Sequence, residues 1–162
     1  MPLMEIKKLI QEETRLLVRF AAAQEELQAV MGRHGWKAVN KKLEAMRRLS
    51  ARIEEVEQNR EACYRALKAE AGLGEDEAFD QFIARLPAGE RRELKEAYIE
   101  LKLAVLRAKG QAGRLGYFVQ TLSDSLRRVL EEAFPHRRAR LYARNGRSQA
   151  VSEPAYMINQ RL

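Results

Sequence analysis

The residues able to do nucleophilic or metal chemistry are few in this chain. The 162 residues include one cysteine, Cys63, and two histidines, His34 and His136. A nucleophilic thiol needs a neighbouring base, and two histidines are too few for a metal site. We therefore expect Cys63 to be a small apolar side chain in a helix seam, and we expect no cofactor and no enzymatic activity.

Two adjacent acidic pairs, Glu54-Glu55 and Glu131-Glu132, are the other candidates for acid–base chemistry. Neighbouring residues on a helix point about 100° apart, so such carboxylates diverge rather than meet. The chain also lacks a glycine-rich phosphate loop and the common hydrolase and metalloprotease motifs. We interpret both acidic pairs as solvated charges on helix surfaces.

The strongest pattern in the sequence is an apolar repeat from Leu94 to Ala133. Its steps alternate between three and four residues, the spacing that keeps side chains on one seam of a supercoiled helix. A seam this long has to pack on other helices, so the sequence predicts a long-helix bundle or coiled coil. The twelve positions are Leu94, Tyr98, Leu101, Val105, Ala108, Ala112, Leu115, Val119, Leu122, Leu126, Val129 and Ala133.

Two earlier seams predict helices over about 3–31 and about 36–71. Only four residues, with a glycine at each end, separate these helices, so they should fold back as an antiparallel hairpin. The seams have polar interruptions, which are Glu13, Gln24, Lys42 and Arg60.

The Gly72-Leu73-Gly74 segment is typical of a helix end, and the acidic triplet that follows favours a new helix start. The sequence thus predicts a short connector helix over about 75–86, with an apolar face that caps the bundle, and a third long helix over about 88–134. The predicted fold is all-α, with a helical bundle in 1–134 and a polar, basic, flexible tail in 135–162.

The positive charge of the chain is concentrated in this tail. The whole chain has a net charge of +7, and residues 135–162 hold six arginines and one acid, giving +5 and leaving +2 for the rest. A nearly neutral body without a recognisable module gives no reason to expect nucleic acid binding. No apolar stretch suits a membrane span and the start lacks a signal-peptide core, so we expect no membrane insertion and a cytoplasmic protein.

Three glycines, Gly110, Gly113 and Gly116, lie near the middle of the third long helix. Each costs a helix interior about 1 kcal/mol relative to alanine. Close approach of a neighbouring helix, a hinge that lets residues 117–134 rearrange, and a full break of the helix are the three explanations. The unbroken seam argues against the break.

Beside the seam, an adjacent aromatic widens the apolar stripe, which then includes Tyr117, Phe118, Leu122, Leu126 and Leu130. An apolar stripe of this width either completes the core of the chain or of a dimer, or it binds a separate partner. Trp36 and Tyr64 are expected in the core, since aromatic residues on bundle helices are usually buried.

The order of these elements resembles the FlgN-type flagellar export chaperones. The likeness covers nearly the whole chain: a helical hairpin, a short connector, a long helix, and a tail with the spacing Tyr-x-x-x-Gly, here Tyr142 to Gly146. The resemblance implies a cytoplasmic chaperone that binds the C-terminal helical segment of hook-associated (hook–filament junction) proteins, prevents their premature assembly and delivers them to the type III export gate.

The resemblance also implies roles for particular residues. Tyr142 and Gly146 would dock on the cytoplasmic domain of the gate protein FlhA, and the protein would be a monomer or weak homodimer. The client would bind the third long helix at Leu115, Phe118, Val119, Leu122, Leu126, Val129 and Leu130. The alternatives are a structural homo-oligomeric coiled coil and a basic helical adaptor for RNA or the ribosome.

Overall fold

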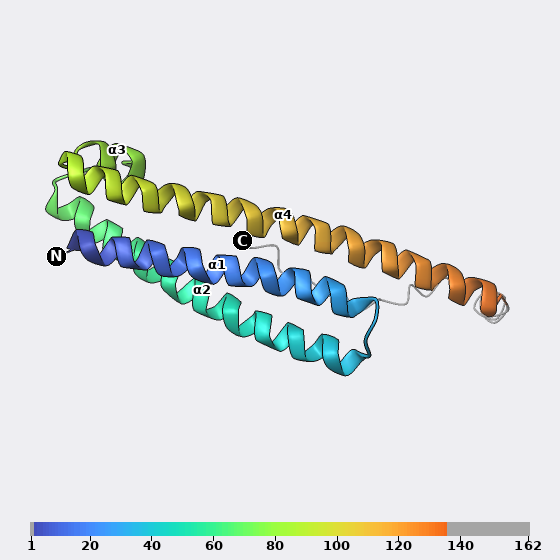
Figure 1. Ribbon diagram of the computed structural model, residues 1–162. Coiled ribbons are helices and arrows are strands. Elements are labelled where there is room, and N and C mark those ends of the chain that lie inside the picture. The colour runs from blue at the N-terminus through green and yellow to red at the C-terminus, as the bar shows by residue number, and fades with distance from the viewer. Residues whose placement is uncertain (1, 136–162) are drawn as a thin grey trace, which may run out of the picture. The chain divides into compact units, whose positions relative to one another are not determined.

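The computed structural model describes residues 2–135, which form helices α1 (Pro2–Met31), α2 (Trp36–Glu70), α3 (Phe79–Ala84) and α4 (Ala88–Ala133) (Figure 1). This arrangement confirms the predicted all-α fold, with a hairpin, a connector helix and a third long helix. The described residues divide into two units, with the boundary between Val119 and Gln120. The proposed tail in 135–162 stays a prediction, because residues 136–162 lie outside the described part.

Helices α1 and α2 form an antiparallel hairpin, side by side in Figure 1. The turn between them begins where the amide N–H groups of Arg33 and His34 both donate to the carbonyl oxygen of Val30, at 3.2 and 3.0 Å. Trp36 opens α2 and is 72% exposed, so its predicted place in the core is wrong. The neighbouring Lys37 is exposed as well, and no described helix covers the ring of Trp36.

Three of the four polar interruptions form ion pairs across the hairpin. Arg60 on α2 donates to Glu13 on α1 at 2.5 Å, and Lys42 pairs with Glu26 at 2.5 Å. Glu13 is only 4% exposed, so the first of these pairs lies inside the bundle. Burial raises the pKa of the Glu13 carboxyl, and the hydrogen bond from Arg60 opposes that rise in part.

The chain leaves α2 through a glycine turn. Gly72 has a φ of +65°, which only glycine adopts without strain, and the N–H of Leu73 donates to the carbonyl of Lys68 at 2.9 Å. This hydrogen bond satisfies a carbonyl at the end of the helix and turns the chain towards α3.

The connector helix is shorter than predicted, because α3 begins at Phe79 rather than near residue 75. The backbone carbonyls before it are bound by side chains: Tyr64 donates to the carbonyl of Glu77 at 2.7 Å, and Lys68 donates to that of Glu75. Phe82 and Ile83 are buried, which confirms the predicted apolar face.

An aromatic cluster attaches α3 to the two helices beside it. The ring of Phe79 lies 4.9 Å from that of Tyr64 on α2 and 4.7 Å from that of Tyr98 on α4, both in edge-on geometry. Tyr64 thus belongs to the core, as predicted. The cluster fixes the start of α4 against the hairpin.

The first part of α4 runs parallel to α1. Lys7 on α1 pairs with Glu93 on α4 at 2.6 Å, and the two residues are 86 positions apart in the sequence. Just beyond the other end of α1, the ring of Phe118 lies 4.0 Å from the place that a Cβ on Gly32 would occupy. These two residues are also 118 − 32 = 86 positions apart. One register therefore holds along the whole of α1. The buried residues of α4 are Leu94, Ala97, Leu101, Ala104, Ala108 and Gln111.

Candidate protein-binding surface on the last helix

The predicted seam of α4 is buried only in its first half. Leu94, Leu101 and Ala108 are buried, whereas Ala112 is exposed and Gln111 takes the buried place. The buried positions keep alternating steps of three and four from Leu94 to Gln111, and Ala97 and Ala104 are buried where the prediction had Tyr98 and Val105. The Oε1 of Gln111 accepts a hydrogen bond from the Nε of Arg114 at 2.8 Å, which satisfies this amide oxygen.

The three glycines in the middle of α4 do not pack against a neighbouring helix in the described part of the chain. The helix is continuous through Gly110, Gly113 and Gly116, so a full break is wrong. A Cβ added at any of them would meet nothing within 4 Å in the described part of the chain, so close approach of a neighbouring helix is also wrong there. The hinge role stays a prediction.

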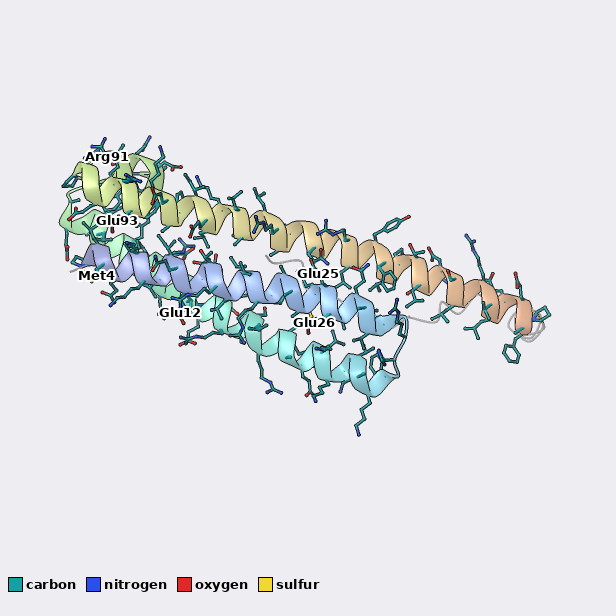
Figure 2. All side chains as sticks on the ribbon, viewed as in Figure 1. Met4, Glu12, Glu25, Glu26, Arg91 and Glu93 are labelled. Carbon is teal, nitrogen blue, oxygen red and sulfur yellow. The ribbon has the colours of Figure 1, made fainter. Side chains whose placement is uncertain are left out.

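Three of the predicted client-binding residues lie in the unit of residues 1–119. Leu115, Phe118 and Val119 are half-buried. Phe118 also borders a cleft of about 460 Å³, whose other lining residues are Glu25, Gln28, Ala29, Gly32, Arg33 and Gln111. Glu25, one of these lining residues, is labelled on α1 in Figure 2. These three side chains are thus only partly available to a partner.

The other four predicted client-binding residues lie on the helical residues 120–133, and three of them are exposed. The exposed fractions are 57% for Leu126, 60% for Val129 and 58% for Leu130, whereas Leu122 is half-buried. On a helix these positions share one face, since Leu126 follows Leu122 by four residues, and Val129 and Leu130 follow Leu126 by three and four. The four residues Leu122, Leu126, Val129 and Leu130 are called the distal apolar face below.

The groups considered for chemistry are dispersed. Cys63 is half-buried, with its Sγ 3.9 Å from the carbonyl oxygen of Pro2, and burial raises the pKa of its thiol. His34, Glu54 and Glu55 are exposed. No group of three metal-ligating side chains occurs among residues 2–135, and none of the helices in that range has an apolar stretch long enough to cross a membrane.

The docking residues of the tail, Tyr142 and Gly146, lie outside the described residues, as does His136. Among the predicted functional residues, those that the structure describes as an exposed apolar group are therefore on the distal apolar face.

Comparison with known protein families places the sequence in a family. The family model described as FlgN protein matches residues 1–150, nearly the whole chain. The chain belongs to the FlgN family. FlgN proteins are flagellar export chaperones that bind hook-associated proteins, which confirms the resemblance in the sequence. No curated relative and no solved structure matches the chain.

A second apolar stripe on α4 escaped the sequence analysis, and it includes Tyr117, whose predicted place beside the seam is therefore wrong. Its members are exposed and lie on the side of the helix opposite the seam, at Ile99, Leu103, Leu106, Gly110, Gly113 and Tyr117. Their spacing of four and three is as regular as that of the seam, but the two glycines at its centre conceal it from any count of apolar residues.

Proposed function

We propose that this FlgN-family protein holds the C-terminal helical segment of a hook-associated protein on the distal apolar face of α4. The observation that carries the proposal is the exposure of Leu126, Val129 and Leu130 in a chain of a chaperone family. Exposed apolar side chains that share a helix face bind an amphipathic helix by burying its apolar stripe.

The chaperone activity follows from the same burial. The client segment carries an apolar stripe that the assembled flagellum buries, and a free stripe of this kind drives premature assembly or aggregation. Covering the stripe with the distal apolar face prevents both. Because the contact is a single helix face, the complex stays weak enough for the export apparatus to separate, and the chaperone acts in the cytoplasm as a monomer or weak homodimer.

Removal of the client segment tests the proposal. The purified chaperone is mixed with a full-length hook-associated protein from the same flagellar system and with a version that lacks its C-terminal helix, and complex formation is measured by size-exclusion chromatography with light scattering. We expect a stable complex with the full-length protein alone. Equal binding of both versions, or self-association of the chaperone that the client does not displace, would contradict the proposal.

Delivery to the export gate is proposed for the tail. The family match extends to residue 150 and so includes Tyr142 and Gly146. A tyrosine in an arginine-rich peptide offers an apolar ring and a hydroxyl group to a partner.

Substitution of the tail tyrosine separates delivery from client binding. We expect Tyr142→Ala to weaken binding of the chaperone–client complex to the FlhA cytoplasmic domain by about ten-fold, as for an interface anchor, with client affinity unchanged. Tyr142→Phe serves as the control and should retain most of the affinity. Biolayer interferometry gives both constants, and a Tyr142→Ala complex that binds FlhA normally would refute this role.

A further inference from the structure

The helix α4 has two opposite apolar faces within residues 88–119. Leu94, Leu101 and Ala108 on one face are buried against the hairpin. The six residues Ile99, Leu103, Leu106, Gly110, Gly113 and Tyr117, called the outer stripe here, lie about 180° away at about 100° per residue. Helices that pack on one side only are normally polar on the other.

The outer stripe is well exposed. Its four large side chains have exposed fractions of 46% for Ile99, 48% for Leu103, 64% for Leu106 and 78% for Tyr117. Figure 2 shows side chains of α4 that project away from the hairpin along this part of the helix. Gly110 and Gly113 stand between the leucines and the tyrosine, where the absence of a side chain allows another backbone to approach closely.

The charges beside the outer stripe are mostly positive. Residues 99–117 contain four basic residues, Lys102, Arg107, Lys109 and Arg114, and one acidic residue, Glu100. Lys102 and Lys109 fall on one margin of the stripe, and Arg107 and Arg114 fall on the other. Lys102 pairs with Asp80 at 3.0 Å, so three of the four cations keep their full charge for a partner across the stripe.

These charges indicate which kind of helix would bind to the outer stripe. A second copy of this chain docked on the same stripe would place margins with a net charge of 4 − 1 = +3 against margins with the same charge, which is unfavourable. A helix with an apolar seam and acidic margins would bury the leucines and pair its carboxylates with the arginines and lysines.

We propose that the outer stripe is a second docking surface, which binds an amphipathic helix with acidic margins while the distal apolar face binds the client. The two faces belong to different stretches of α4, residues 99–117 and 122–130, so one chaperone has room for both partners. The inference goes beyond the proposed function and stands even if the client binds elsewhere.

Two designed peptides test the inference. Both are 21-residue helices with the same leucine seam, one with glutamate and one with lysine on both margins, each labelled and used below its self-association range. Fluorescence anisotropy with the full chain should show binding of the acidic peptide and at least about ten-fold weaker binding of the basic one. The Leu103→Asp/Leu106→Asp variant should lose at least about ten-fold in affinity for the acidic peptide.

Matched variants complete the test. Arg107→Glu/Lys109→Glu should reverse the preference in favour of the basic peptide, and Leu126→Asp/Val129→Asp should leave acidic-peptide affinity unchanged. Circular dichroism checks that each variant remains helical. Equal binding of the two peptides, no binding of either, or self-association of the wild type that Leu103→Asp/Leu106→Asp abolishes would overturn the inference. Client affinity, measured on the same variants, reports separately on the proposed function.

Discussion

Leu126→Asp/Val129→Asp is expected to abolish client binding, with an affinity loss of at least about 100-fold. Burial of one leucine or valine side chain is worth about 1.5–3 kcal/mol, and about 1.4 kcal/mol corresponds to a ten-fold change in affinity. Two such side chains therefore supply enough free energy for the predicted loss, and the buried aspartates add a desolvation cost. Isothermal titration with a full-length hook-associated protein measures the effect.

The matched control is Leu103→Asp/Leu106→Asp, which makes the same chemical change on the outer stripe. Both pairs are exposed, so neither variant should unfold the helix, and far-ultraviolet circular dichroism checks this. We expect the control to bind the client with the affinity of the wild type. Equal loss in both variants would show that the client does not distinguish the two faces, and no loss in the first would remove the distal apolar face as its site.

The second large effect concerns the stability of the hairpin. Arg60→Leu leaves the Glu13 carboxylate buried without its partner, and breaking a buried ion pair in this way costs about 3 kcal/mol or more. Arg52→Leu is the control, because Arg52 also joins α2 to α1, at 2.6 Å from Glu12, but is exposed. Its loss should cost less than about 1 kcal/mol. Urea unfolding followed by circular dichroism gives both free energies.

The pH dependence of the same variant provides an independent check. Burial raises the pKa of Glu13 in the folded state, so the folded protein binds the proton more tightly than the unfolded chain does, and this carboxyl lowers stability as the pH rises from the unfolded pKa through the folded one. Loss of Arg60 removes the interactions that lower this pKa. The defect of Arg60→Leu should therefore shrink on acidification, and Glu13→Gln in the same chain should reduce it at neutral pH. A defect independent of pH would show that Arg60 acts through packing alone.

The parts of the fold that the sequence predicts well are those set by one repeating signal. Alternating steps of three and four residues predict long helices, and Gly32 and Gly35 predict the turn of the hairpin. In the sequence, Glu13 and Arg60 looked like defects in two separate seams, because each seam is recognised along a single helix. Their 2.5 Å contact joins two helices, so neither seam alone reveals it.

The candidate surfaces were harder to predict, because the exposure of a side chain on α4 depends on how far the neighbouring helices extend beside it. The seam of α4 continues to Ala133 in the sequence, yet α1 ends at Met31, which the shared register matches to Tyr117. The early seam residue Leu101 is therefore core, whereas Leu126 of the same repeat is exposed. The outer stripe was missed because Gly110 and Gly113 count as breaks in an apolar pattern.

Hydrogen–deuterium exchange of the chaperone with and without a bound hook-associated protein tests most directly whether the client binds the distal apolar face. Backbone amides in an exposed helix exchange faster than those in a packed core, and a bound helix slows them. We predict strong protection of residues 120–133 on complex formation, with little change in α1 and α2. Protection confined to the hairpin, with residues 120–133 unchanged, would contradict the proposed client site.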